Sequence, residues 1–158
     1  MYLKMVNFIN KGDIFNLNGV HSYAHGCNCA GAMGKGIALQ FRERYPKMYA
    51  EYKKLCQQGK FNPGDVFDYD YGEGHIYNLG TQKTWRTKAE VPYIRESLDK
   101  MLKLAQSAGV KSIALPTVGA GLGGLSWDLV KALIEDVASN YSMVDLFVVE
   151  SYSPDFKR

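Results

Sequence analysis

The sequence of 158 residues has few features of a membrane, secreted or metal-binding protein. No apolar run approaches the roughly 20 residues that a membrane-spanning helix needs. The first residues lack the long apolar stretch of a secretion signal. Cys27, Cys29 and Cys56 are an odd number of cysteines, without the spacing of a disulfide framework or a metal site. We therefore expect a cytoplasmic protein in a reducing compartment, with no metal or cofactor and no contact with a membrane.

The net charge and the amino-acid composition exclude few classes of protein. The formal net charge is +3, with 46% hydrophobic and 22% charged residues. This composition is ordinary for a globular protein, and the mild positive charge permits an anionic partner without requiring one. There is no internal repeat, low-complexity tract or linker, so we expect residues 1–158 to form a single domain.

Two glycine-rich segments stand out against this background. The first runs His25-Gly-Cys-Asn-Cys-Ala-Gly-Ala-Met-Gly-Lys-Gly-Ile-Ala38, and the second runs Leu115-Pro-Thr-Val-Gly-Ala-Gly-Leu-Gly-Gly-Leu-Ser-Trp127. Each follows a strand-like apolar run and leads into an amphipathic helix. Glycine lets backbone N–H groups approach a ligand closely, and a helix N-terminus favours negative charge. Two such loops facing each other would hold a diphosphate.

Neither segment matches the common nucleotide-binding motifs. The stretch Gly34-Lys-Gly36 lacks the hydroxyl residue and the preceding spacing of a P-loop. Gly119, Gly121 and Gly124 have the spacing of the dinucleotide fingerprint, but no acidic residue follows at the expected distance on a second strand. A hydride-transferring enzyme is therefore not expected.

The order of elements predicts an α/β domain with a largely parallel, two-sided sheet. We expect strands at 3–9, 22–27, 65–71, 75–79, 112–115 and 145–150, and helices at 37–45, 46–57, 92–107 and 126–139. A tight turn is expected at 10–15, a serine cap at Ser126, and a fraying polar tail from Tyr152 to Arg158. In such a fold ligands bind outside the carboxyl ends of the strands, where both glycine segments lie.

The glycine segments, together with Lys11-Gly-Asp-Ile14 and Tyr77-Asn-Leu-Gly-Thr-Gln82, resemble the motifs of the macrodomain family in order and spacing. The resemblance covers almost the whole chain. It implies a three-layer αβα fold with a mixed, largely parallel sheet, and it implies binding of ADP-ribose or an ADP-ribose derivative. The branch that it most resembles contains ADP-ribose-1″-phosphate phosphatases, a lysine-dependent terminal ADP-ribose glycohydrolase, and an antitoxin that removes ADP-ribose from DNA thymidine.

The resemblance also implies roles for individual residues. Asp13 and the N–H of Ile14 would bind the adenine, with Tyr152 beside it, and Asn28 would bind the distal ribose. The two glycine loops would bind the phosphates. The expected ligand-binding residues are Asp13, Ile14, Asn28, Ala32, Met33, Gly34, Gly36, Ile37, Thr81, Gln82, Thr117, Val118, Gly119, Ala120, Gly121, Leu122 and Gly123.

The catalytic residues of the lysine-dependent glycohydrolase are absent from the matching positions. Gln82 stands where that enzyme has its lysine nucleophile, and Gly123 stands where it has its aspartate. Lys83 is one position away and, on a strand, would point to the opposite side. Glutamine cannot form the covalent lysyl adduct. The same substitution argues against the antitoxin reaction, which depends on the same lysine position.

His25 and Asn28 remain as catalytic candidates. A histidine near a phosphoester can transfer protons near neutral pH, although a buried structural histidine is an equally good interpretation. We expect a hydrolase that releases phosphate from ADP-ribose-1″-phosphate. The first alternative is a non-catalytic module that binds ADP-ribose. The second is an ADP-ribosyl glycohydrolase acting on protein or on nucleic acid, for which Lys83, Trp85, Arg86 and Lys88 would form a basic and aromatic rim.

Overall fold

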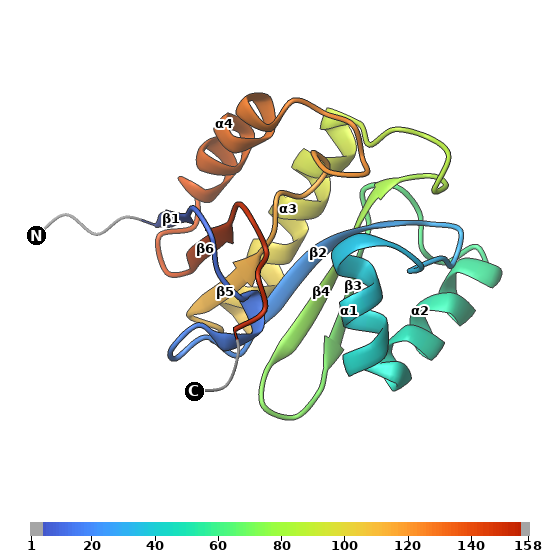
Figure 1. Ribbon diagram of the computed structural model, residues 1–158, viewed down its shortest axis with the longest axis horizontal. Coiled ribbons are helices and arrows are strands. Elements are labelled where there is room, and N and C mark those ends of the chain that lie inside the picture. The colour runs from blue at the N-terminus through green and yellow to red at the C-terminus, as the bar shows by residue number, and fades with distance from the viewer. Residues whose placement is uncertain (1–4, 156–158) are drawn as a thin grey trace, which may run out of the picture.

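The computed structural model describes residues 5–155, which form one six-stranded sheet between two pairs of helices (Figure 1). The strands are β1 (Val6–Ile9), β2 (Tyr23–Asn28), β3 (Val66–Asp70), β4 (His75–Gln82), β5 (Ser112–Leu115) and β6 (Asp145–Val149). They lie in the order β1-β6-β5-β2-β4-β3. All neighbouring strands are parallel except β3 and β4, which form an antiparallel hairpin. The expected α/β fold with a mixed, largely parallel sheet is confirmed.

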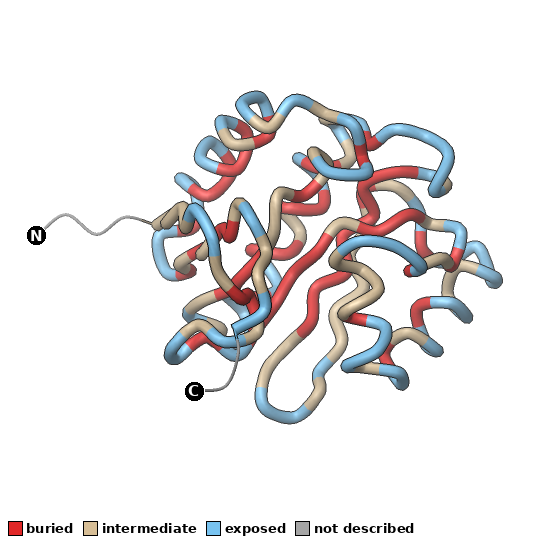
Figure 2. The backbone as a smooth tube through the Cα atoms, in the orientation of Figure 1, coloured by how far each residue is buried: buried red, intermediate tan, exposed pale blue. Residues whose placement is uncertain are grey.

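The helices are α1 (Gly36–Arg44), α2 (Pro46–Gln57), α3 (Val91–Ser107) and α4 (Trp127–Ala138). Apolar side chains of α1 and α2 pack on one face of the sheet, and those of α3 and α4 pack on the other. Figure 2 shows the buried backbone concentrated in the central strands and on the inner sides of the helices. Within residues 5–155, no helix combines the length and the apolar character needed to cross a membrane.

Local sequence signals explain most of these elements. Ile94, Leu98 and Met101 recur at helical spacing, and all three are almost completely buried on α3. Gly109 follows that helix with a φ of +73°, the left-handed conformation that ends many helices. Pro46 begins α2, where a missing N–H costs nothing. The hairpin of β3 and β4 is also present as expected, although β4 continues to Gln82.

The structure differs from expectation at several ends of elements. The first strand begins at Val6, and positions 3 and 4 of the expected strand lie outside the described residues. Ser126 precedes α4, but its side chain makes no capping hydrogen bond. The expected turn at 10–15 runs into a short 3-10 helix, η1 (Ile14–Asn16), because the Asp13 carboxylate accepts a hydrogen bond from the N–H of Phe15.

The described part of the C-terminal tail is held in place, which corrects the expected fraying. Tyr152 forms a parallel bridge with Gly12, and the N–H of Ser153 donates to the Gly12 carbonyl at 2.8 Å. The N–H of Asp155 donates to the Asp13 carboxylate at 3.3 Å. Backbone pairing therefore fixes the tail beside the first loop as far as residue 155. Positions 156–158 lie outside the described residues.

Candidate functional site

The five parallel strands end at the same edge of the sheet, and all of them except β6 lead directly to residues that the sequence singled out. In sheet order, β1 leads to Asp13, β6 leads to Glu150, and β5 leads to the second glycine loop. Next to them, β2 leads to the first glycine loop and β4 ends at Gln82. Sheet order therefore arranges these segments in one row across the carboxyl edge, the usual ligand site of an open α/β sheet.

Two adjoining cavities lie along this row. The first, of about 430 Å³, is lined by Gly26, Cys27, Asn28, Ala32, Met33, Gly34, Lys35, Ala38, Gln82, Trp85 and Leu122. The second, of about 260 Å³, is lined by Gly26, Lys35, Gly36, Ile37, Ala38, Thr81, Gln82, Pro116, Thr117, Val118, Gly119, Gly121, Leu122, Gly123, Val149, Glu150 and Tyr152. Because Gly26, Lys35 and Gln82 line both, we treat them as two chambers of one cleft.

The side chain of Asn28 organises the first glycine loop. Its Nδ2 donates to the Ala32 carbonyl at 2.8 Å, and its Oδ1 accepts from the Ala30 N–H at 3.0 Å. The buried Tyr52 hydroxyl donates to the Asn28 carbonyl at 2.7 Å and lies 3.0 Å from Asn28 Oδ1. Asn28 therefore both lines the first chamber and holds the loop that forms its wall.

The second glycine loop is shaped by close backbone contacts. Gly119 has a φ of +75°, and a Cβ atom there would collide with Ile94 Cδ1. A Cβ at Gly123 would lie 2.6 Å from the Gly119 carbonyl oxygen. A side chain is thus disfavoured at Gly119 by the positive φ and by the Ile94 side chain, and it is excluded at Gly123 by the backbone of Gly119. An aspartate at position 123 would not fit this loop without a rearrangement.

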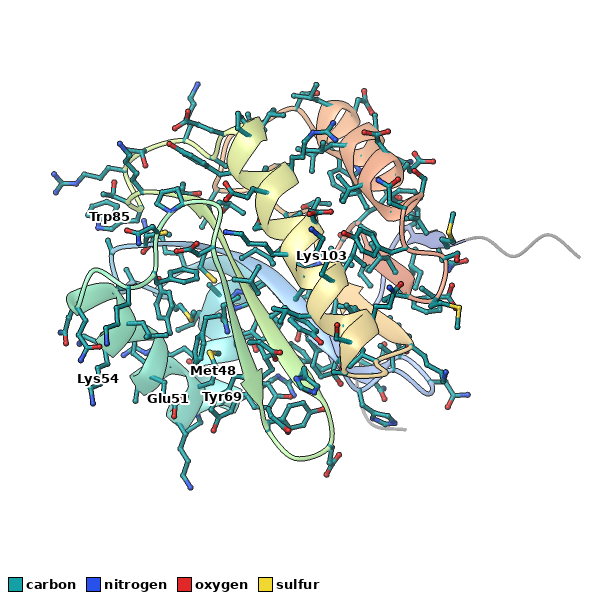
Figure 3. All side chains as sticks on the ribbon, turned by 180° about the vertical axis from the view of Figure 1, so that it is seen from behind. Met48, Glu51, Lys54, Tyr69, Trp85 and Lys103 are labelled. Carbon is teal, nitrogen blue, oxygen red and sulfur yellow. The ribbon has the colours of Figure 1, made fainter. Side chains whose placement is uncertain are left out.

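Gln82 lies where the two chambers meet. Its Nε2 donates to the carbonyls of Thr84 and Thr87, at 2.9 and 2.8 Å, so the amide holds the following loop against the cleft. Lys83 is exposed and lies just past the end of β4, so strand alternation does not decide its direction. The loop also carries Trp85, which lines the first chamber although 59% of its surface is exposed (Figure 3).

His25 is close in sequence to the first chamber but does not reach it. Its side chain is completely buried, and its ring stacks on Phe41 with centroids 4.0 Å apart. Nε2 lies 2.7 Å from Asn78 Oδ1. Burial lowers the pKa of His25 to about 4, against a smaller opposing effect of the Asn78 hydrogen bond. A neutral ring with no access to the cleft does not support the catalytic role that we expected for His25.

The two residues that we expected to bind the adenine do not line the cleft, unlike most of the expected ligand-binding residues. Asp13 and Ile14 are buried and line neither chamber, and both Asp13 carboxylate oxygens accept backbone N–H groups. Ala120 lies outside the lining as well. The remaining expected ligand-binding residues all line one chamber or both.

Sequence reasoning missed the two charged side chains of the cleft. Lys35 lines both chambers and Glu150 lines the second. Lys35 stands between Gly34 and Gly36 in the first glycine segment, and a lysine between closely spaced glycines is a signal that could have identified it. Glu150 carried no local signal, because a single carboxylate at a strand end is common. Cys27 also lines the first chamber, and burial raises the pKa of its thiol well above the ordinary value, so it is protonated at neutral pH.

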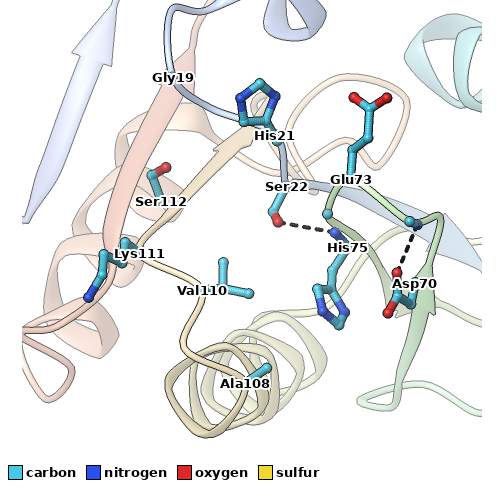
Figure 4. Close-up of a pocket in the computed structure, with 12 residues that line it drawn as sticks. Gly19, His21, Ser22, Asp70, Glu73, His75, Ala108, Val110, Lys111 and Ser112 are labelled. Atoms are coloured by element: carbon cyan, nitrogen blue, oxygen red, sulfur yellow. Dashed lines mark hydrogen bonds between the residues drawn. The ribbon is translucent and has the colours of Figure 1, made fainter.

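A third cavity, of about 370 Å³, lies at the opposite edge of the sheet (Figure 4). It is lined by His21, Ser22, Glu73, His75 and Lys111 among others. The Ser22 hydroxyl accepts the backbone N–H of His75, and the His75 ring pairs with Asp68 at 2.7 Å. The side chains of Ser22 and His75 therefore stabilise the hairpin of β3 and β4. None of the glycine-rich motifs reaches this edge.

Known proteins resemble this chain in sequence and fold. The DNA ADP-ribosyl glycohydrolase of Thermus aquaticus is 38% identical over 135 residues, covering 83% of this chain and 38% of that protein. Human ADP-ribose glycohydrolase OARD1 is 32% identical over 127 residues, covering 80% of each chain. The ADP-ribose 1″-phosphate phosphatase of the yeast Lodderomyces elongisporus is 27% identical over 128 residues, covering 73% of this chain and 80% of that one.

The solved macrodomain of Mycobacterium tuberculosis DarG superposes with a TM-score of 0.86 at 33% identity, covering 92% of this chain and 97% of that one. The chain spans little more than a third of the length of the Thermus aquaticus glycohydrolase, 38% of it. A family model described as the macro domain matches residues 24–134, the stretch from β2 into α4 that contains both glycine loops and Gln82. From its sequence, its fold and its cleft, the chain belongs to the macrodomain family.

Proposed function

We propose that the cleft binds ADP-ribose or an ADP-ribose derivative and that the chain hydrolyses a bond at the distal ribose. The observation that carries the proposal is the row of segments along the carboxyl edge of the sheet. Glu150 and Tyr152 line only the second chamber, Asn28 lines only the first, and Gln82 lines both. An adenosine diphosphate with a second ribose is an elongated ligand that matches such a row. The three relatives are named for reactions of ADP-ribose derivatives, which supports the same class of ligand.

The diphosphate belongs between the two glycine loops. Lys35 contributes to both chambers and supplies a cation at their junction. Helix α1 begins at Gly36, so its first backbone N–H groups and its positive dipole end face the same region. In the second loop, the N–H groups of Val118 and Ala120 donate to the carbonyls of Pro116 and Thr117. Gly119, Gly121 and Gly123 also line the second chamber, and their N–H groups have no partner within the described residues, so they suit a phosphate. A cation, a helix N-terminus and two loops together suit two adjacent phosphates.

The distal ribose belongs in the first chamber, beside Asn28 and Gln82. Within the described lining of that chamber, no carboxylate is present and the Cys27 thiol is protonated. With Gln82 at the lysine position and Gly123 at the aspartate position, we infer that a water molecule attacks rather than a side chain. Lys35 would stabilise the charge that develops on a departing phosphate. The favoured substrate is therefore ADP-ribose-1″-phosphate, with phosphate and ADP-ribose as products.

A second candidate reaction is release of ADP-ribose from DNA. One observation favours it: Trp85, at the mouth of the first chamber, is 59% exposed, and the Arg86 guanidinium lies over its ring at 4.6 Å from the centroid. Lys83 and Lys88 are exposed on the same loop. An exposed indole beside cationic side chains can stack on a base and contact phosphates. The name of the Thermus aquaticus relative agrees with this second reaction.

The test combines calorimetry with two assays. Titration with ADP-ribose should give binding, and ADP-ribose-1″-phosphate should release phosphate, whereas an ADP-ribosylated oligonucleotide should release ADP-ribose only if the second reaction holds. Lys35→Ala should weaken binding at least about tenfold, because it removes the cation beside the diphosphate. Lys54→Ala, an exposed lysine on α2, is the matched control and should bind normally.

The outcomes separate the alternatives. Binding without turnover of either substrate would leave a non-catalytic module that reads ADP-ribose. Absence of binding by the folded wild type would refute the proposal altogether. If Lys35→Ala bound as tightly as Lys54→Ala, the diphosphate could not lie where we put it.

A further inference from the structure

Glu150 is a fixed carboxylate in the wall of the second chamber. It follows β6 directly, and its backbone N–H donates to the Ile9 carbonyl at 2.8 Å. The Trp127 indole Nε1 donates to Glu150 Oε2 at 2.7 Å, and Lys131 Nζ lies 3.8 Å from the same oxygen. The backbone and one carboxylate oxygen are thus both held by neighbouring elements.

The partners of Glu150 are themselves well supported. The Trp127 ring packs edge-on against Phe8, with centroids 6.3 Å apart, and the Lys131 ammonium lies over the Phe8 ring at 4.4 Å from its centroid. Helix α4 therefore holds the carboxylate through Trp127 and Lys131, and Phe8 of strand β1 supports both of these side chains. Only 26% of the Glu150 side chain is exposed. Both contacts use Oε2. Among residues 5–155 no hydrogen bond to Oε1 is found, so Oε1 can accept one from a ligand.

The position of Glu150 along the row decides which part of a ligand it would meet. The second glycine loop lies on one side of it in sheet order, and the segment of Asp13 and Tyr152 lies on the other. With the diphosphate at the loop and the adenine near Tyr152, the group between them is the ribose attached to adenine. This placement rests on the proposed function.

We propose that Glu150 is a specificity-determining residue for that ribose. Its carboxylate accepts hydrogen bonds from the 2′- and 3′-hydroxyls, and it rejects a ligand that carries a phosphate at the 2′ position. A hydroxyl is a good donor to an ionised carboxylate, whereas a phosphate group brings two like charges together in a partly buried wall. The cleft thereby selects derivatives of ADP-ribose over derivatives of its 2′-phosphate.

The experiment is a pair of calorimetric titrations, with ADP-ribose and with ADP-ribose 2′-phosphate. The wild type should prefer ADP-ribose by about tenfold or more. Glu150→Gln keeps an acceptor oxygen but removes the charge, so its preference should fall to about threefold or less, chiefly through tighter binding of the 2′-phosphate. Asp128→Asn, an exposed acidic residue in the first turn of α4, is the matched control and should keep the wild-type ratio.

Equal binding of the two ligands by the wild type would overturn the proposal without using any variant. An unchanged ratio in folded Glu150→Gln would overturn it as well. A wild type that bound neither ligand would instead refute the ADP-ribose assignment on which it rests. Raising the salt concentration should reduce the preference of the wild type for ADP-ribose over its 2′-phosphate. The reduction should be smaller in Glu150→Gln, because that variant lacks the charge whose repulsion salt screens.

Discussion

The imidazole of His25 and the side-chain amide of Asn78 form a buried pair between neighbouring strands, with Nε2 and Oδ1 2.7 Å apart. Asn78 Nδ2 donates to the Phe67 carbonyl at 3.1 Å, so its oxygen is the end that faces His25. Nε2 of His25 must therefore carry the proton and donate. Burial, and not this hydrogen bond, keeps the ring neutral, and the pair ties β2 to β4 and, through Asn78, β4 to β3.

The neutral state of His25 makes stability depend on pH. In the unfolded chain the ring takes up a proton as the pH falls through about 6.5, whereas in the folded chain burial holds its pKa at about 4. The unfolded state then binds more protons, so the stabilisation is complete above about pH 6.5 and is lost as the pH falls toward 4. Urea unfolding should give a free energy about 2 kcal/mol lower at pH 5 than at pH 7.5 from this residue alone.

His25→Gln is the variant that isolates this contribution. It keeps a donor for Asn78 but does not titrate, so the difference between pH 7.5 and pH 5 should shrink by about 2 kcal/mol. A variant with wild-type pH dependence would show that His25 titrates normally. A variant of wild-type stability with no phosphate release would restore the catalytic role.

Gly119 should tolerate no side chain. Gly119→Ala would push a Cβ into Ile94 at a positive φ, and should lower the free energy of unfolding by about 2 kcal/mol. Gly121→Ala, two residues along the same loop, meets no atom within 4 Å and should change stability by less than about 0.5 kcal/mol. Thermal unfolding of the two variants measures the difference, and equal melting temperatures would contradict the loop geometry.

Gln82 should affect the affinity for ADP-ribose indirectly, because it positions the loop that carries Trp85. Gln82→Glu has the same shape but faces the Thr84 and Thr87 carbonyls without a donor, so the loop with Trp85 should detach. ADP-ribose affinity should fall about tenfold, measured by calorimetry. Gln106→Ala, an exposed glutamine on α3, should bind as the wild type does. Unchanged affinity in Gln82→Glu would mean that the loop is positioned without the amide.

Tyr52 should support the first loop from beneath. Tyr52→Phe removes the hydroxyl that donates to the Asn28 carbonyl and leaves that buried carbonyl without this partner, so the free energy of unfolding should fall by about 1–2 kcal/mol. Tyr49→Phe removes a hydroxyl from a half-buried tyrosine that contacts the Gly31 carbonyl, and should cost less. Urea titrations compare the two, and a larger loss in Tyr49→Phe would contradict the assignment.

Local signals were enough to predict the α/β fold and the place of the cleft. Strand-like runs ending in glycine, followed by helical stripes such as Ile94, Leu98 and Met101, determine where each element begins and ends. Because parallel strands end at one edge, the two glycine loops had to meet there. The glycines also predicted that the backbone of these loops takes positive φ angles or approaches other groups closely, because only glycine does so without strain.

Only the tertiary structure decided which side chains reach the cleft. Strand alternation assigns His25 to one face of β2, but its burial depends on Phe41 and Asn78, which come from distant parts of the chain. The orientation of Glu150 likewise depends on Trp127, 23 positions away. The sequence by itself determined the backbone frame and the glycine loops, because those follow from local pattern. Packing between distant segments determined the charges and hydrogen bonds of the site, because contact partners are fixed only when the elements assemble.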